Sequence, residues 1–259
     1  MKYFFTSDIL FCMKKVFPST LSAKRLARKT IDLFSAVIVV ATIGILATST
    51  VLAQKSADMS SAASGYAIYK GEPKEEKASV MFNVYEGAEN VMQILEILRE
   101  FGAKATFFIG GIWAEKNAET LLRIVSEGHE LGCHGYLHRD HSVMSVEQNK
   151  EEIAICCNLI RAVTGVTVTL FAPPSGAYGK NTEEACRSLG MKLIMWTKDT
   201  IDWRDADIDL LVSRATKNIS KGDLILMHPK PQSVEALPRI LAAYNEKGIA
   251  LATVSDTIT

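Results

Sequence analysis

The sequence predicts an α/β protein built around a parallel β-sheet. Short apolar runs alternate with amphipathic stretches from about residue 78 to the end of the chain. Repeated strand-then-helix order favours a parallel sheet, either closed into a barrel or doubly wound. Polar residues directly follow several of the expected strands, and in such folds the chemistry collects at the carboxyl ends of the strands.

The expected elements can be placed in order along the chain. A strand at 79–84 is followed by apolar residues at helical spacing, until Gly102 ends the helix. Ser145 with Gln148 makes a capping box ahead of a helix that reaches about residue 163. The remaining pattern predicts strands at 105–109, 166–171, 192–196, 224–227 and 249–254, and helices at 121–126, 183–189, 210–219 and 237–245.

Composition argues against nucleic acid as a partner. Lys+Arg and Asp+Glu both total 29, so the formal net charge is zero and no bulk attraction to a polyanion exists. The five cysteines include no Cys-x-x-Cys pair, which predicts free thiols rather than a disulfide framework. A neutral substrate is compatible with this balance.

The amino-terminal part predicts export. Residues 1–32 are basic, and 33–53 form an uncharged apolar run of about the twenty residues that cross a bilayer. The basic flank predicts a cytoplasmic amino terminus, with a single-pass signal-anchor and an extracytoplasmic domain at 78–259. Small residues up to Ala53 leave open a cleaved signal peptide and a secreted protein. Residues 54–77 read as a small and charged linker.

A histidine cluster is the strongest chemical signal. Four of the five histidines fall between His129 and His141. His134 and His138 are four residues apart, so one helical turn would aim both rings at a single ion, as metal ligands require. Taken alone, the same spacing also fits an exposed loop with ordinary histidines.

Together with two later motifs, this cluster resembles a known family. His134-x-x-x-His138, Asp199-Thr-x-Asp-Trp203 and Leu226-x-His228 occur at the intervals of the NodB-homology polysaccharide deacetylases, carbohydrate esterase family 4. The resemblance covers roughly residues 78–257. The tethered layout, Asn83-Val84 and the segment 171–174 look most like a divergent, sporulation-associated branch of that family.

The resemblance implies a distorted (β/α) barrel of the NodB type and a divalent metal, usually zinc, held by one aspartate and two histidines. The substrate would be an N-acetylated cell-wall or spore glycan. His134 and His138 match the metal histidines, and His228 matches the general acid. Asp199 matches the carboxylate that orients this acid. Three residues fall on groove-lining positions: Pro173, Trp203 and Leu226.

The chain departs from the family's first and third motifs. Asn83 stands where an aspartate normally acts as general base, and an amide cannot accept that proton. The second aspartate has no clear counterpart, and Glu86 is the expected third metal ligand, with the Asn83 amide oxygen as a weak alternative. Ala172 replaces the arginine that usually tunes the base.

These departures leave several functions open. One is an active deacetylase that uses Glu86 or a metal-bound hydroxide in place of the missing base. A second is a catalytically impaired protein that keeps the glycan-binding groove. A third is a membrane-anchored scaffold for envelope or spore assembly, and a cytosolic amidohydrolase is the competing enzyme. Losing a general base typically costs about 10²–10⁴-fold in rate.

Overall fold

A computed structural model of the chain describes residues 65–259. The predicted basic segment, the signal-anchor and the first part of the linker lie outside the described residues. Within residues 65–259, the helices are all too short or too polar to span a bilayer.

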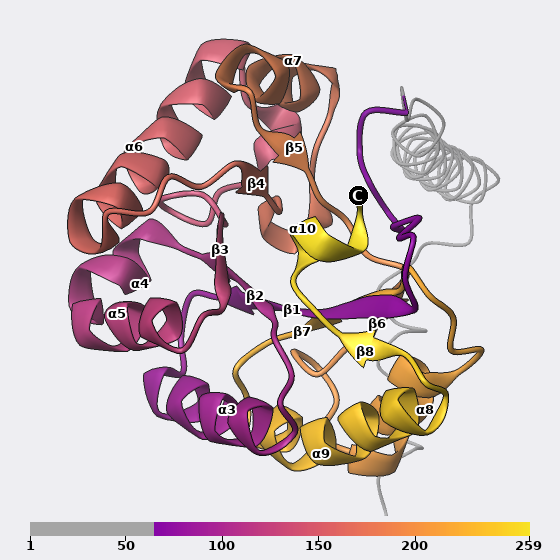
Figure 1. The fold of residues 1–259 in the computed structure, drawn as a ribbon. Coiled ribbons are helices and arrows are strands. Elements are labelled where there is room, and N and C mark those ends of the chain that lie inside the picture. The colour runs from indigo at the N-terminus through magenta and orange to yellow at the C-terminus, as the bar shows by residue number, and fades with distance from the viewer. Residues whose placement is uncertain (1–64) are drawn as a thin grey trace, which may run out of the picture. The chain divides into compact units, whose positions relative to one another are not determined.

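The described residues form an open barrel of eight strands, and every pairing in it is parallel (Figure 1). The hydrogen-bonded order is β5-β4-β3-β2-β1-β7-β6, with β8 paired to β1. Because β5 and β6 end this order without pairing to each other, the sheet is a half-barrel, as the NodB-type prediction requires. The strand bounds are β1 Lys77–Val84, β2 Thr106–Ile109, β3 Glu130–Cys133, β4 Leu170–Phe171, β5 Lys192–Leu193, β6 Lys198–Asp199, β7 Leu224–Met227 and β8 Ala250–Leu251.

Helices surround the sheet and follow the strands in sequence (Figure 1). The Ser145 capping box is present, with Gln148 bonded back to the cap, so the predicted helix start is confirmed. The helix bounds are α3 Ala88–Glu100, α4 Gly111–Lys116, α5 Ala118–Ser126, α6 Val146–Thr164, α7 Lys180–Leu189, α8 Ile208–Thr216, α9 Pro231–Glu246 and α10 Val254–Thr257, with 3-10 turns η1 His141–Val143 and η2 Pro174–Gly176.

The strands differ most from the predicted pattern where they are short. The predicted strand 166–171 narrows to β4, and β3 and β6 were not predicted at all. β3 contains Gly132, where a Cβ atom would approach the Phe108 ring to 2.4 Å. A glycine weakens the apolar alternation that marks a strand, and β6 has only two residues, both charged.

The predicted linker extends too far into the domain. Tyr66 donates its hydroxyl hydrogen bond to the Met191 carbonyl, and Ile68 forms a parallel bridge with Ile194. The backbone of Gly71 bonds to Gly222 and passes so close to residue 257 that no Cβ fits there. The end of the predicted linker is therefore part of the folded domain.

The core has two layers, one between the sheet and the helices and one inside the barrel. Alternate residues of β1 face opposite sides. Phe82 and Val84 pack with the surrounding helices, whereas Met81 packs with an inner cluster that fills the barrel. Asn83 therefore shares the inner side with Met81. The inner cluster comprises Met81, Phe108, Leu170, Ala172, Ile194, Leu224, Leu226 and Val254.

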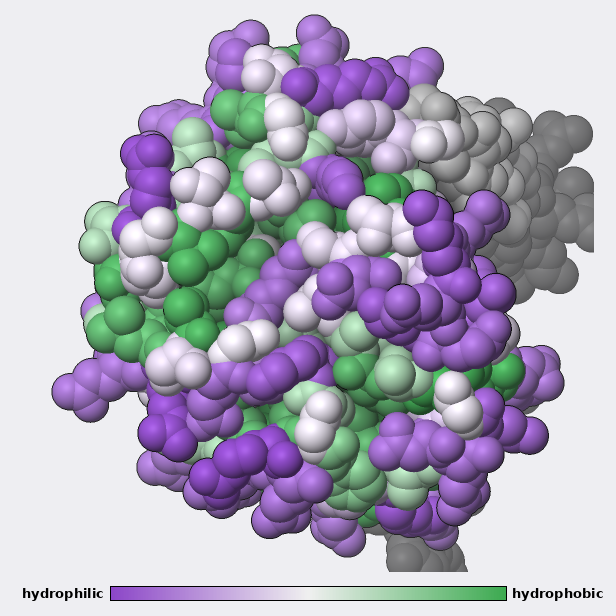
Figure 2. All heavy atoms as spheres, viewed as in Figure 1, coloured by the Kyte–Doolittle hydropathy of each residue, from purple (hydrophilic) through white to green (hydrophobic). Residues whose placement is uncertain are grey.

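The outer surface is mostly polar. Figure 2 shows hydrophilic residues over much of the face drawn, with apolar residues gathered toward the side where Figure 1 places α4, α5 and α6. Each of these helices has one exposed large apolar side chain: Ile112 in α4, Leu122 in α5 and Ile155 in α6. Exposed apolar side chains on a surface are common and do not by themselves indicate a site.

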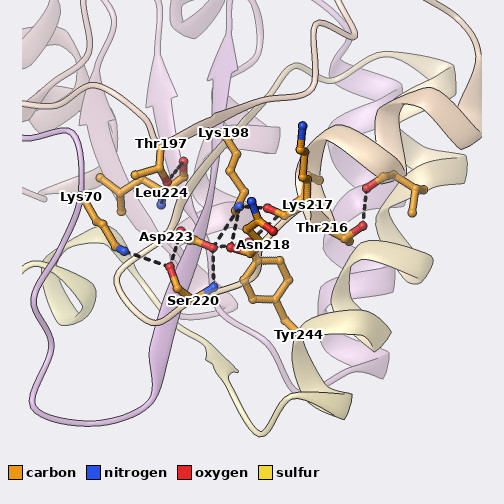
Figure 3. A network of polar contacts seen from close by, with 12 residues as sticks. Lys70, Thr197, Lys198, Thr216, Lys217, Asn218, Ser220, Asp223, Leu224 and Tyr244 are labelled. Carbon is orange, nitrogen blue, oxygen red and sulfur yellow. Dashed lines mark hydrogen bonds and ion pairs between the residues drawn. The ribbon is translucent and has the colours of Figure 1, made fainter.

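A buried polar network around Asp223 holds β6 in place through Lys198 (Figure 3). Asp223, 2% exposed, accepts hydrogen bonds from the backbone and hydroxyl of Ser220 and from the Tyr244 hydroxyl, at 2.8–3.0 Å. The Lys198 ammonium lies 3.4 Å from the Asp223 carboxylate. Because Lys198 points into this network, its neighbour Asp199 points to the other face of the strand.

Replacing Asp223 by asparagine should destabilise the domain strongly. The buried Lys198 ammonium would lose its counter-charge, and breaking a buried pair in this way typically costs about 3–5 kcal/mol. The measurement is the free energy of unfolding in urea. Asp209→Asn is the matched control, because Asp209 pairs with Arg239 on the exposed surface and should cost less than about 1 kcal/mol. Equal losses in the two variants would contradict the role given to the network.

Candidate functional site

A cavity of about 310 Å³ opens at the carboxyl ends of the strands. Its walls come from β1, β6, β7 and the loops after β3, β4 and β5, so segments far apart in the sequence meet there. This is where ligands bind in parallel α/β folds. The lining residues are Asn83, Tyr85, His134, His138, Ser175, Gly176, Trp196, Asp199, Trp203, Leu226 and His228.

His134 and His138 meet in this cavity, with ring centroids 5.1 Å apart. They do not share a helical turn as predicted: His134 follows β3, and His138 lies in a loop with φ 55°. His134 Nδ1 is 2.8 Å from the Ala172 carbonyl, so Nδ1 donates and Nε2 is left as an acceptor. Burial lowers the pKa of His134 to about 3 and also lowers the pKa of His138.

Glu152 from α6 holds the histidine loop in place. Its buried carboxylate accepts hydrogen bonds from the backbone N–H groups of Tyr136 and Leu137, both at 2.9 Å. Arg139 lies 3.4 Å from the other carboxylate oxygen. These bonds shape the turn that carries His138, which no pattern in the sequence indicates.

Glu152→Ala should therefore displace His138 and destabilise the domain. Two partly buried backbone N–H groups would lose their acceptor, at about 1 kcal/mol each. Urea unfolding gives the stability, and the ¹H–¹⁵N shifts of the His138 ring report its position. The exposed neighbour Glu151 provides the control: Glu151→Ala should leave both readings near those of the natural chain.

His228 is held by Asp202, which corrects the predicted role of Asp199. The Asp202 carboxylate is fully buried and accepts from His228 Nδ1 and from the His228 backbone N–H, both at 2.7 Å. It also accepts from the Ser233 hydroxyl at 2.5 Å. Nδ1 of His228 is thereby the donor toward Asp202, which leaves Nε2 for the cavity. The motif contains two aspartates three residues apart, Asp199 and Asp202. The family resemblance assigns the orienting role to the first, whereas in the structure the second contacts His228.

Asp199 lines the same cavity as a half-buried carboxylate. One of its oxygens accepts from the backbone N–H of Ile201 at 2.8 Å. Burial is the largest influence on its pKa, which is raised above the usual aspartate value. Asp199 forms no ion pair within residues 65–259, because Arg214 nearby is bonded to Asp205 and to a backbone carbonyl.

The base position holds Asn83, at the end of β1. Asn83 is 2% exposed, and its Oδ1 atom has no hydrogen-bond partner in the described part of the chain. Tyr85 follows two residues later on the same side of the chain, and its ring lies 4.3 Å from the His138 ring and 6.2 Å from that of His228. Tyr85 thus stands beside the two histidines, a position that alternation from Asn83 could have identified.

Glu86 does not join the histidines as the predicted third ligand. Its carboxylate pairs with Lys230, and its side chain is 45% exposed outside the cavity lining. The turn here depends on Gly87, whose φ is 73° and where a Cβ would approach the Pro229 carbonyl to 2.2 Å. The backbone of this turn directs the Glu86 side chain toward Lys230 and away from His134 and His138.

Two of the three predicted groove residues, Trp203 and Leu226, line the cavity. Pro173 is buried beside it, and the same loop contributes Ser175 and Gly176 instead. Trp196, Tyr85 and the role of Asp202 were missed. Ala172 belongs to the inner core, and its carbonyl holds His134, so this position carries no tuning arginine.

A three-ligand metal centre does not fit the residues present. Catalytic zinc usually takes three protein ligands and keeps a fourth position open. Residues 65–259 contain no group of three His, Cys, Asp or Glu side chains placed to hold an ion. His134 and His138 provide two imidazoles, and the neutral amide oxygen of Asn83, buried without a partner, lies in the same lining as a weak further ligand.

His129 lies outside the cavity and acts structurally. Its Nδ1 atom accepts from the Ala105 backbone N–H at 3.3 Å, which requires an unprotonated ring nitrogen. Burial lowers the pKa of His129 to about 4, below the value of about 6.5 expected in the unfolded chain. Between these values the unfolded state binds the additional proton.

Acidification should consequently destabilise the domain as the pH falls from about 6.5 toward 4. His129→Gln removes this titration, so its free energy of unfolding should fall less steeply over the same window. Urea unfolding at several pH values measures both slopes. Identical slopes for the variant and the natural chain would contradict the assignment.

Comparison with known proteins agrees with this architecture. The polysaccharide deacetylase family matches residues 70–194. Bacillus subtilis YlxY is 35% identical over 73% of this chain, and the matched part spans 59% of that protein's length. A peptidoglycan-N-acetylglucosamine deacetylase of Bacillus cereus is 26% identical over 75% of this chain and 93% of its own length.

Solved structures extend the comparison to the fold. BA3943, described as a CE4 family pseudoenzyme from Bacillus anthracis, superposes with a TM-score of 0.72 at 33% identity, covering 74% of this chain and 69% of that one. A BA3943 mutant described as having restored enzymatic activity superposes equally well, at 31% identity over 74% of this chain and 71% of that one. With this fold, these motifs and these relatives, the chain belongs to the polysaccharide deacetylase family.

Proposed function

We propose that this protein binds an N-acetylated envelope glycan in the cavity and deacetylates it only slowly. The proposal rests on one observation: the cavity keeps the residues expected of the general acid and lacks those expected of the general base. Its acid half is complete, with His228 held by Asp202. Its base half is altered: Asn83 near the end of β1 and Tyr85 just after β1 line the cavity.

The acid half retains a clear chemical role. Nε2 of His228 faces the cavity, because Nδ1 is committed to Asp202, and an imidazole there can pass a proton to a departing amine. Asn83 cannot take a proton from water as an aspartate would. A site with its acid and without its base is expected to lose about 10²–10⁴-fold in rate.

Aromatic side chains support glycan binding. Trp203 is 53% exposed and Tyr85 is 37% exposed, and both line the cavity together with Trp196. Exposed aromatic rings offer flat apolar surfaces, and they occur where a ligand covers them. Relatives named peptidoglycan deacetylases support peptidoglycan as the glycan class.

The proposal also includes zinc binding and attachment of the protein to the membrane. Family members are generally metal-dependent, and His134 with His138 would give zinc two imidazole ligands here, so we expect weak zinc binding. The apolar run 33–53 supports export and membrane attachment, which would place the domain beside the cell wall or spore glycan.

Fluorescence titration of the full-length chain with N-acetylglucosamine oligomers tests the binding. The exposed Trp203 should report saturable binding, and Trp203→Ala should weaken the affinity about tenfold or more, as removal of a central aromatic contact does. Ile155→Ala on α6 is the control, since it removes an exposed apolar side chain outside the cavity. Calorimetry repeats the measurement without the fluorophore. Absence of binding by both methods would refute the proposed function.

A further inference from the structure

The charge and hydrogen-bonding character of the cavity suggests which form of the glycan it prefers. Its lining includes one carboxylate without an ion pair, Asp199, and no lysine or arginine. Basic side chains near the cavity are engaged elsewhere: Lys230 pairs with Glu86, and Arg204 and Arg214 both pair with Asp205. A carboxylate that faces a cavity without a lysine or arginine partner favours a cationic ligand.

Three acceptor atoms of the lining also lack a hydrogen-bond partner among the described residues. Asn83 Oδ1 is buried without a partner, and His134 Nε2 is an acceptor because Nδ1 donates to the Ala172 carbonyl. Asp199 uses one oxygen for the Ile201 N–H, and the described residues give its other oxygen no partner. Three acceptors therefore line one cavity and lack donors.

We propose that this cavity selects a glucosamine residue whose amino group is free and protonated over the N-acetylated residue. A primary ammonium carries three N–H donors, matching the three acceptors of Asn83, His134 and Asp199, and it supplies the missing positive charge. An acetamide carries one N–H and no charge, so it would leave a desolvated carboxylate uncompensated. This selectivity rests on the proposed glycan binding and names the preferred chemical form.

Asp199 is then the specificity-determining residue. Burial already raises the pKa of this carboxyl group, and a bound ammonium would offset that desolvation. Its position is fixed by β6, whose other residue, Lys198, is anchored in the Asp223 network (Figure 3). Asp199 therefore presents its charge to the cavity from a rigid strand rather than from a loop.

Calorimetric titration of the full-length chain tests the proposal with two matched tetrasaccharides, one of N-acetylglucosamine and one of glucosamine. A chelator is present, so that no zinc occupies His134 Nε2. The buffer is slightly acidic, so that the amino groups of the glucosamine oligomer are protonated. The glucosamine oligomer should bind about tenfold more tightly, which corresponds to one charge-assisted hydrogen bond. Asp199→Asn should bring the ratio of the two affinities close to one, whereas Asp209→Asn, which removes an exposed charge outside the cavity, should preserve it.

The outcomes separate this inference from the proposed function. Equal binding of both oligomers, or a ratio unchanged in Asp199→Asn, would overturn the selectivity and leave glycan binding intact. Failure of both oligomers to bind would overturn both. A ratio that Asp209→Asn lowers as much as Asp199→Asn would indicate general charge attraction and would also overturn the role of Asp199.

Discussion

A chain carrying both Asn83→Asp and Tyr85→Asp should release acetate from N-acetylglucosamine oligomers about 10²-fold faster than the natural chain, or more, in buffer containing zinc. Asn83 lies near the end of β1 and Tyr85 follows β1 directly, and both line the cavity with His134 and His138. Aspartate at 83 would supply a group able to accept a proton. Aspartate at 85 would place a carboxylate where the tyrosine ring now contacts His138.

The single variants separate the two contributions. Tyr85→Asp alone should raise zinc affinity, because it brings the ligand set to two imidazoles and one carboxylate, yet release little acetate. Asn83→Asp alone should release less acetate than the double variant, because one carboxylate would have to serve both as metal ligand and as base. His138→Ala in the double variant should abolish the gain. If the double variant and the natural chain release acetate at the same rate, the missing groups are not what limits hydrolysis.

Asp202→Asn should cost about 1–3 kcal/mol for each buried donor that it leaves without an acceptor, the largest single effect expected for a residue beside the cavity. Asp202 is fully buried and accepts three hydrogen bonds, two from His228 and one from Ser233. An asparagine amide can replace only part of this, because its NH₂ group would face donors. Urea unfolding measures the loss.

Asp199→Asn is the matched comparison for the same motif. Asp199 is half-buried and accepts one backbone hydrogen bond that an asparagine oxygen can also accept, so its loss should stay within about 1 kcal/mol. The ring nitrogen shifts of His228 should change in Asp202→Asn and stay near the natural values in Asp199→Asn. The reverse order in stability and in shifts would restore Asp199 as the orienting residue.

The fold was predictable because most of its elements carry strong patterns. β1, β7 and the capping box before α6 combine apolar runs with recognisable ends, and all three occur where expected. β3 and β6 were missed since their few residues include a glycine or only charges. A strand of two residues has no measurable alternation, so it forms only through its neighbours in the sheet.

The site was predictable in its residues and less so in its contacts. The motifs identified six residues that line one cavity in the structure: His134, His138, His228, Asp199, Trp203 and Leu226. Spacing could not say which aspartate of 199 and 202 reaches His228, because the chain turns between them, with Ile201 at φ 57°. Glu86 failed for a similar reason: the Gly87 turn and the Lys230 ammonium decide its direction, and both are properties of the folded chain.

The most direct test of an incomplete catalytic site measures binding and turnover on the same preparation of the natural full-length chain. Calorimetry with an N-acetylglucosamine tetramer gives the affinity, and a coupled acetate assay with added zinc gives the rate. We expect saturable binding together with acetate release at least about 10²-fold below that of the Asn83→Asp/Tyr85→Asp chain. Natural-chain turnover equal to that of the double variant would contradict the account.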